Sequence, residues 1–354
     1  MNQKVIVGLS GGVDSTVAAY LLKKQGYDVI GVTMELWKGE HSQKAIEDAS
    51  RVAEKLGIPF EVLDFSKEFR KYVVDDFIRQ YQLGLTPNPC IVCNRFIKGE
   101  ALLKKAKELG AEHIATGHYA RIEKHPETGR YAIRNSATAV KDQTYALYRL
   151  TQEQLGAMIL PIGEYTKDAV REMAQEIDGF IAKKGDSQDI CFIPDGDYAA
   201  FIQGQGESCG KAGNFVDRQG NVLGRHKGIV HYTVGQRKGL GIAFGKPMYV
   251  YGSKPKENEV VLCDNQELFQ TKLYAGDLAH MAVEKFEDGM RFLAKIRYAH
   301  KAAWCTVRMA AEDVLEVTFD EPQRAITPGQ SLVLYDGEYV AGGGFVLPDW
   351  AVKK

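Results

Sequence analysis

The 354-residue sequence predicts an α/β protein in which a parallel-sheet domain is followed by two small β-rich domains. Three observations predict this class. Short apolar runs alternate with amphipathic segments up to about residue 203, eleven glycines then fall within residues 204–245, and β-type runs continue from about 274. We therefore expect domains at 1–203, 204–273 and 274–354.

The first domain shows regular alternation of predicted strands and helices. Runs rich in β-branched residues predict strands at 4–9, 28–34, 60–65 and 113–118. Helical spacing predicts helices at 16–26, 43–57, 96–110 and 166–177, with a hairpin at 121–134 and a capping box opening a helix at 151. Because the strands are apolar throughout, we expect a parallel sheet covered on both faces. The second domain is expected to be a small antiparallel module that includes GIVHYTV (228–234), and the third a barrel-like sheet.

Composition and charge narrow the class of protein. The chain is 45 % hydrophobic and 26 % charged with a net charge of −1, which is ordinary for a globular protein and argues mildly against one that coats nucleic acid. No apolar run is long enough for a membrane span, and the N-terminal apolar stretch is too short for a signal peptide, so we expect a cytoplasmic protein. Six cysteines do not make a disulfide framework, and the isolated ones, Cys209, Cys263 and Cys305, are expected to be packing residues.

The stretch SGGVDS (10–15) lies between the first predicted strand and the first helix. Glycines there allow the backbone to approach a ligand, and the free amides of a helix N-terminus favour an anion such as phosphate. Asp14 would repel phosphate unless it serves a metal or orients the loop, so Mg²⁺ is a plausible companion. The stretch is neither a Walker A loop nor GxGxxG, and a plain glycine-rich turn is the alternative.

The stretch NPCIVCNR (88–95) places Cys90 and Cys93 three residues apart. Four interpretations compete: a zinc knuckle, a redox pair, an iron–sulfur ligand pair, or a catalytic thiol with a helper. Structural zinc needs four ligands, and the sequence has no second CxxC or HxxxH. Two incidental thiols in a loop are the plain alternative.

Further motifs point to one family. SGGVDS resembles the signature of the pyrophosphatase-loop (PP-loop) ATPases, whose fold is adenine nucleotide alpha hydrolase-like. It is followed in order by TPNPCIVCN (86–94), TGHYAR (116–121), KDQTYALY (141–148), DSQDICFI (186–193), YTVGQRKGLGI (232–242) and TPGQSLVLYDGEYVAGGG (327–344). Together these motifs resemble the tRNA-specific 2-thiouridylase family, which thiolates the wobble uridine. The resemblance implies that ATP, with Mg²⁺, adenylates the C2 oxygen of the uracil before sulfur displaces AMP.

The resemblance also implies the sulfur chemistry. Cys93 matches the family's nucleophile and Cys191 matches the cysteine that carries a persulfide. In the family the two cysteines meet at one site and are alternately joined by a disulfide. Many members have aspartate where this chain has Cys90. Cys90, Cys93 and Cys191 could therefore ligate three irons of a [4Fe–4S] cluster whose fourth iron binds sulfide. Persulfide and cluster chemistry both stay open, and a mobile segment at 182–189 would suit the meeting of the thiols.

Ligand contacts follow from the same match. The expected ATP contacts are Gly8, Leu9, Ser10, Gly11, Gly12, Val13, Asp14, Ser15, Met34 and Gly117. The expected contacts to the target base are Asn88, Pro89 and Cys90. The expected tRNA contacts are His118, Lys141, Asp142, Gln143, Arg297, Tyr298 and Gln330. The implied partners are the anticodon stem-loop of tRNA and a sulfur-donor protein, either a desulfurase or a sulfur carrier.

One RNA contact surface is also visible in the residues themselves. Residues 291–308 contain six Lys, Arg or His residues and no acid, interleaved with Tyr298 and Trp304. Basic residues mixed with aromatics suit RNA, although a solvated strand face is the simpler interpretation of such a run. The function expected is a tRNA-uridine 2-sulfurtransferase. The alternatives are a PP-loop ligase that adenylates a small molecule, similar to argininosuccinate or GMP synthetases, and a non-catalytic RNA-binding module.

Overall fold

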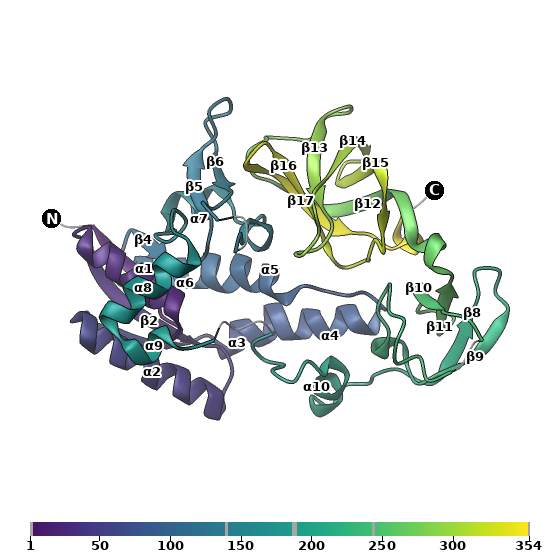
Figure 1. Ribbon diagram of the computed structural model, residues 1–354, viewed down its shortest axis with the longest axis horizontal. Coiled ribbons are helices and arrows are strands. Elements are labelled where there is room, and N and C mark those ends of the chain that lie inside the picture. Colours follow the sequence, from purple (N-terminus) through teal and green to yellow (C-terminus); the bar gives the residue numbers. More distant parts are fainter. Residues whose placement is uncertain (1–2, 139–140, 186–189, 243–244, 353–354) are drawn as a thin grey trace.

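The computed structural model describes residues 3–138, 141–185, 190–242 and 245–352. It consists of a parallel-sheet domain, a small central sheet and a C-terminal barrel, and helix α4 (Asp75–Gln82) runs between the first domain and the two β-rich parts (Figure 1). Among the described helices, none has both the length and the apolar character that crossing a bilayer would need. The predicted fold class is confirmed.

The first domain is built on a five-stranded parallel sheet in the order β3-β2-β1-β4-β7. The strands are β1 (Lys4–Gly8), β2 (Asp28–Glu35), β3 (Phe60–Asp64), β4 (His113–Ala115) and β7 (Met158–Ile159). Alternate side chains of β1 pack into the hydrophobic cores on opposite faces of the sheet. Val5 and Val7 pack with α1 (Val13–Lys24), α2 (Glu40–Leu56) and α8 (Lys167–Ile177), whereas Ile6 packs with α4, α5 (Pro89–Cys93) and α6 (Leu102–Glu108). Both faces of the sheet are therefore covered at β1, as the apolar strands predicted, whereas the edge strand β3 is exposed at Glu61, Val62 and Asp64.

The helices of this domain carry the expected end signals. They are α1 (Val13–Lys24), α2 (Glu40–Leu56), α3 (Ser66–Phe69), α5 (Pro89–Cys93), α6 (Leu102–Glu108), α7 (Gln152–Ala157), α8 (Lys167–Ile177), α9 (Gly179–Ala182) and α10 (Tyr198–Gly204). The capping box at Thr151 and Gln154 is present. Two stretches are π-helical, η1 (Arg70–Val74) and η2 (Asn94–Ala101), so the helix expected at 96–110 is wound differently in its first half.

The central sheet differs from the expectation. Its order is β10-β11-β8-β9, from β8 (Gly213–Val216), β9 (Val222–His226), β10 (Tyr249–Lys254) and β11 (Glu259–Cys263). Because β11 pairs with β8 in parallel, the module is mixed rather than antiparallel. The stretch expected to be a strand at 228–234 is the 3-10 turn η4 (Ile229–His231), because Gly228 has φ +135 and lies against the Cys209 carbonyl, where a Cβ would be only 2.5 Å away.

The C-terminal sheet has the order β12-β15-β14-β13-β16-β17-β6-β5, and an extra β12–β17 pairing closes strands β12 to β17 into a barrel. These strands are β12 (Phe269–His280), β13 (Arg291–Lys295), β14 (Ala303–Ala311), β15 (Val314–Arg324), β16 (Ser331–Asp336) and β17 (Tyr339–Val346). The expected boundary at 273/274 falls inside β12, which pairs with β15 from its first residue. Short 3-10 turns are η3 (Thr144–Ala146), η5 (Asn265–Leu268) and η6 (Asp349–Ala351).

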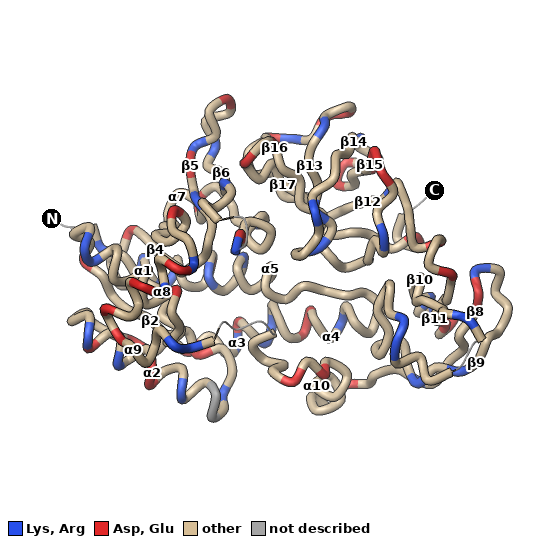
Figure 2. Tube along the Cα trace, in the orientation of Figure 1, with Lys and Arg blue, Asp and Glu red and all other residues tan. Residues whose placement is uncertain are grey.

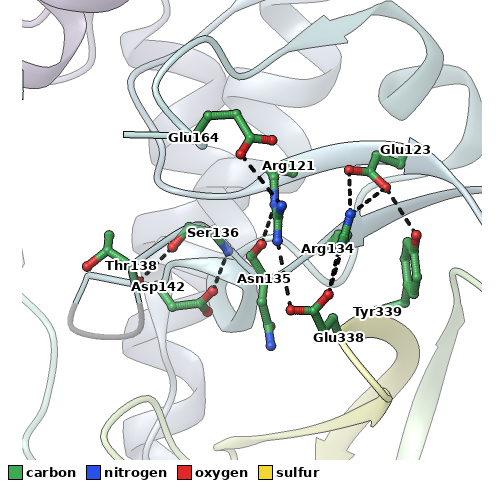
Figure 3. A network of polar contacts seen from close by, with 10 residues as sticks. All are labelled: Arg121, Glu123, Arg134, Asn135, Ser136, Thr138, Asp142, Glu164, Glu338 and Tyr339. Atoms are coloured by element: carbon green, nitrogen blue, oxygen red, sulfur yellow. Dashed lines mark hydrogen bonds and ion pairs between the residues drawn. The ribbon is translucent and has the colours of Figure 1, made fainter. Parts of the chain in front are cut away.

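The predicted hairpin is present, formed by β5 (Arg121–Lys124) and β6 (Tyr131–Arg134), but it pairs with β17 of the barrel. Figure 3 shows the polar contacts at this junction: Arg134 binds Glu123 and Glu338, and the Tyr339 hydroxyl donates to Glu123. The Arg130 guanidinium reaches the Met281 carbonyl at 2.8 Å. The first and third domains therefore share one sheet.

Candidate functional site

The SGGVDS loop forms a tight turn between β1 and α1. Gly11 has φ +68, and a Cβ there would lie 2.8 Å from the Asp48 Cβ and 2.9 Å from the Ala45 carbonyl oxygen. The Ser15 hydroxyl accepts from the Ser10 amide and donates to the Gly12 carbonyl, both at 3.2 Å. The turn therefore presents the first amides of the twelve-residue helix α1 at the carboxyl end of the sheet, where an anion is favoured.

Two lysines that sequence reasoning missed lie against this loop. Lys167 Nζ binds Asp14 Oδ1 at 2.7 Å, and the Tyr119 hydroxyl donates to the same oxygen at 2.8 Å. Lys184 Nζ donates to the Gly11 carbonyl at 2.7 Å and also pairs with Asp48. The repulsion expected between Asp14 and phosphate is therefore offset by a partly buried lysine. Both lysines come from the region around α8 and α9, so no local sequence signal could have placed them here.

The remaining predicted ATP contacts gather at neighbouring strand ends. Met34 lies near the end of β2, and its Cε would be 3.3 Å from a Cβ on Gly8 at the end of β1. Gly117 follows β4 and touches the start of α1, since a Cβ there would lie 2.6 Å from the Asp14 carbonyl carbon and 2.7 Å from the Ser15 nitrogen. The three strands thus bring these residues together, as expected for parallel strands.

Helix α5 carries the thiol pair. Asn88 is its N-cap, with Oδ1 accepting from the Cys90 amide at 3.1 Å, and Pro89 occupies the first turn. Cys90 is exposed and Cys93 is buried. The pKa of the Cys93 thiol is raised to about 12, mainly by burial, with Lys98 acting to lower it and the nearby Cys191 and Cys90 thiols acting to raise it. In this conformation Cys93 is therefore a protonated thiol at neutral pH.

Cys191 belongs to the same group of thiols. Residues 186–189 of the segment expected to move lie outside the described residues, and Cys191 itself follows them with part of its surface open to solvent. Surrounding protein raises the pKa of its thiol, and the neighbouring Cys90 contributes. The structure therefore brings together three cysteines that lie up to about a hundred residues apart in sequence.

The three thiols do not fit an iron–sulfur cluster as they are arranged. All six cysteines are described and unpaired. Within residues 3–138, 141–185, 190–242 and 245–352, no three His, Cys, Asp or Glu side chains form a group that could hold a metal ion. The prediction that Cys90, Cys93 and Cys191 are cluster ligands gains no support from this geometry.

The charge of Lys98 acts on both His118 and the thiols. His118 directly follows Gly117, and its Nδ1 lies 2.7 Å from the Thr116 hydroxyl. Burial lowers the pKa of His118 well below its usual value, and the charge of Lys98 lowers it further. Because the charge of Lys98 also acts on Cys93 and Cys191, His118 and these thiols lie in one neighbourhood, and Gly117 beside His118 packs against the start of α1.

The predicted tRNA contacts divide into two groups. Asp142 and Gln143 hold local structure: Asp142 accepts from the Ser136 amide and Gln143 Oε1 accepts from the Tyr119 amide, at 2.9 Å and 2.8 Å. The Tyr298 hydroxyl donates to the Asp142 carbonyl at 3.1 Å, which places the barrel beside the segment that contains Lys141.

Arg297 and Gln330 also make contacts within the protein. The Arg297 guanidinium donates to the Arg324 carbonyl at 3.1 Å, and burial lowers the pKa of Arg297. Gln330 Nε2 donates to the carbonyl of Thr86 at 2.8 Å. The structure therefore brings Gln330 close to the segment that leads to Asn88.

The positive charge of the basic run at 291–308 is partly neutralised by acidic side chains from outside the run. Arg291 pairs with Asp320 and Arg308 with Glu316, both acids on β15. Trp304 and Tyr298 are nevertheless half exposed, and Arg291 lies 5.6 Å from the Trp304 ring. Figure 2 shows basic and acidic residues interspersed along the barrel strands. The exposed aromatics, more than net charge, distinguish this surface.

Comparison with known proteins now identifies the family. Three family models match consecutive parts of the chain: the tRNA methyl transferase HUP domain over residues 3–195, the tRNA methyl transferase PRC-barrel domain over 200–264, and the aminomethyltransferase beta-barrel domain over 270–346. The chain is 54 % identical over 356 residues to the tRNA-specific 2-thiouridylase MnmA of Lachnoclostridium phytofermentans, covering 98 % of this chain and 99 % of that protein. It is 53 % identical to the protein of the same name from Clostridioides difficile, covering 98 % of both chains. This chain belongs to the tRNA-specific 2-thiouridylase family. The family resemblance predicted from the motifs is confirmed.

Likeness to solved structures is weaker. The U34-tRNA thiolase NcsA from Methanococcus maripaludis, solved with its [4Fe-4S] cluster, has a TM-score of 0.35 and 19 % identity, covering 58 % of this chain and 66 % of that chain. The NH3-dependent NAD synthetase from Campylobacter jejuni has a TM-score of 0.33 and 20 % identity, covering 58 % of this chain and 76 % of that chain. At these scores neither likeness bears on mechanism.

Proposed function

We propose that this chain catalyses the ATP-dependent 2-thiolation of the wobble uridine, U34, of tRNA. The observation that carries the proposal is the grouping of the three thiols near Lys98 and His118, whose neighbour Gly117 packs against the start of α1. A ligase acting on a small molecule would have no use for the cysteines or for a barrel joined to the catalytic domain by a shared sheet.

The first step activates the base. The C2 oxygen of the uracil attacks the α-phosphorus of ATP, and pyrophosphate leaves. The amides at the start of α1 would hold the departing phosphates, with Lys167 and Lys184 as nearby positive charges. Asp14, whose Oδ1 accepts from Lys167 and the Tyr119 hydroxyl, would hold Mg²⁺ through its other carboxylate oxygen, since the ion is usually bound through one or two carboxylates together with phosphate oxygens. The ion would neutralise phosphate charge.

The second step delivers sulfur. The terminal sulfur of a persulfide on Cys191 attacks C2, and AMP leaves with the former C2 oxygen. The thiolate of Cys93 then attacks the Cys191 sulfur, which breaks the remaining S–S bond, releases 2-thiouridine and leaves a Cys93–Cys191 disulfide. A dithiol reductant resets that disulfide, and a desulfurase or sulfur carrier reloads Cys191.

Substrate binding has to activate Cys93 in this scheme. Burial keeps the pKa of its thiol at about 12, so the free enzyme holds the nucleophile protonated. The thiolate form of exposed Cys90, in the position where many relatives have aspartate, is the proposed base that takes the proton of Cys93 and becomes a thiol once the anticodon loop is bound. We expect Asn88, Pro89 and Cys90 to border the extruded uracil, which costs little to present from a single-stranded loop. The unpaired cysteines suit the reducing cytoplasm proposed for the chain.

The test compares three alanine variants. We expect Cys93→Ala and Cys191→Ala each to abolish thiolation, measured by the retardation of product tRNA on organomercury gels, while ATP affinity stays within about twofold of wild type. Cys209→Ala is the matched control, because this half-buried thiol donates to the Ala199 carbonyl outside the site. Wild-type activity in either of the first two variants would refute the assignment. Pyrophosphate release stimulated by a metabolite rather than by tRNA would favour the ligase alternative.

A further inference from the structure

The turn between β15 and β16 binds the backbone just before α5, the helix that carries Cys90 and Cys93. Gln330 Nε2 donates to the Thr86 carbonyl at 2.8 Å, and the Thr86 amide donates to the Pro328 carbonyl at 2.9 Å. Both backbone groups of Thr86 are therefore bound by one turn of the barrel. Thr86 lies only two residues before Asn88, the N-cap of α5.

The approach between the two chains is as close as a glycine allows. Gly329 has φ +89, and a Cβ on it would lie 2.8 Å from the Thr86 nitrogen and 3.0 Å from the Leu85 Cβ. These are backbone and near-backbone atoms that cannot move aside alone. The Pro328–Gln330 turn and the Leu85–Thr86 segment therefore fit together in one arrangement.

The turn is itself firmly held on the barrel side. The Gln330 amide donates to the Thr327 carbonyl, and the Gln330 carbonyl accepts from the Val346 amide at 2.8 Å. Ser331, the next residue, is fully buried, and its carbonyl accepts from the Tyr145 hydroxyl at 2.7 Å. Movement of the barrel at this point would therefore be passed to Thr86 rather than absorbed in the turn.

The segment that follows Thr86 carries the proposed base contacts and the nucleophile. Pro89 fixes the backbone at the first turn of α5, and the Asn88 side chain fixes the Cys90 amide. With so little freedom between Thr86 and Cys93, a displacement of Thr86 moves Asn88, Cys90 and Cys93 together.

We propose that Gln330 is a positioning residue that sets the place of the Thr86–Cys93 segment from the barrel. The inference rests on the proposed thiolation and adds to it a route by which the barrel controls the catalytic helix. Half-buried Gln330 was expected from the family to touch tRNA, and direct RNA contact predicts a different result from positioning.

The experiment uses the full chain with Gln330→Ala and Gln330→Glu. The glutamate keeps the shape but places a carboxylate oxygen where the N–H donor was, so its effect should equal or exceed that of alanine. Gln323→Ala is the matched control, since that amide donates to the Glu321 carbonyl within β15.

We expect both Gln330 variants to speed amide hydrogen exchange in peptides covering residues 84–93 by about tenfold and to lower the single-turnover thiolation rate at saturating tRNA by about 10- to 100-fold. The dissociation constant for tRNA should stay within about twofold, and Gln323→Ala should change neither quantity.

Two results would overturn the proposal: unchanged exchange in residues 84–93, or weakened tRNA binding with an unchanged saturated rate, which is the signature of a direct RNA contact. If the wild-type chain thiolates no tRNA, the proposed function fails, while the exchange result still decides whether Gln330 positions the segment.

Discussion

Replacing Gly117 by alanine should damage the ATP site through a contact that can be measured in the structure. The new Cβ would lie 2.6 Å from the Asp14 carbonyl carbon, 2.7 Å from the Ser15 nitrogen and 2.8 Å from the Asp14 carbonyl oxygen. Gly117 does not have the positive φ that would add backbone strain, so the effect is one of space alone. Ordinary contact begins at about 3.4 Å, so the first turn of α1 or the loop after β4 must shift by roughly 0.8 Å.

That shift falls on the backbone proposed to bind phosphate. Overpacking of this kind costs about 1–3 kcal/mol of folding stability. A misplacement of about 1 Å at the site should weaken the affinity for Mg·ATP by about 10- to 100-fold. Equilibrium nucleotide binding measures the affinity, and thermal unfolding confirms that the variant is folded. Gly204→Ala is the control, because a Cβ at that position meets no atom within 4 Å. A folded Gly117→Ala variant that binds Mg·ATP like wild type would show that the loop does not hold the nucleotide.

Two further predictions concern ionisable groups. Hydrogen bonds from Tyr274 and Arg308 lower the pKa of Glu316 from its ordinary 4.5 to about 2, so the folded chain binds this proton less readily than the unfolded chain. The stabilisation by Glu316 is therefore complete above pH 4.5 and is lost as the pH falls towards 2. Urea unfolding should show the Glu316→Gln variant about 1–2 kcal/mol less stable than wild type at pH 7, and this difference in unfolding free energy should close by pH 2–3. A difference that stays constant with pH would contradict the assignment. Iodoacetamide at pH 8 should label exposed Cys90 at least about tenfold faster than Cys93, because burial leaves Cys93 protonated with a pKa of about 12; equal labelling in peptide mass spectrometry would show that Cys93 is open in the free enzyme.

Sequence reasoning succeeded where the signal was local. The apolar runs predicted the strands at 4–9, 28–34 and 60–65, and Thr151 with Gln154 predicted a capping box, since each pattern is set by residues a few positions apart. Helix α4 was missed although its buried residues, Phe77, Ile78 and Tyr81, have helical spacing. Asn88 followed by Pro89 is likewise a known signal for the start of a helix, and it could have predicted the start of α5.

The failures involve contacts between distant parts of the chain. The parallel β8–β11 pairing was not expected, because the sequence of the 42 residues between the two strands does not indicate whether they pair parallel or antiparallel. Lys167 and Lys184 contact the phosphate loop because of the way α8 and α9 pack, and no sequence motif predicts such a contact. The thiols were grouped by family resemblance, and the structure supplies what resemblance could not: Cys93 is buried and its pKa is high.

The sheet shared by β6 and β17 has a consequence for how the protein is made. Arg134 and its partner Glu338 are 204 residues apart, so at about 5–20 residues per second the ribosome needs roughly 10–40 s to supply the second strand after the first. Throughout that interval the newborn hairpin presents an unsatisfied edge to its surroundings. A stop codon anywhere upstream of β17 would leave that edge permanently open, so truncated products should be recognised by chaperones or proteases even when the nucleotide-binding half has already folded.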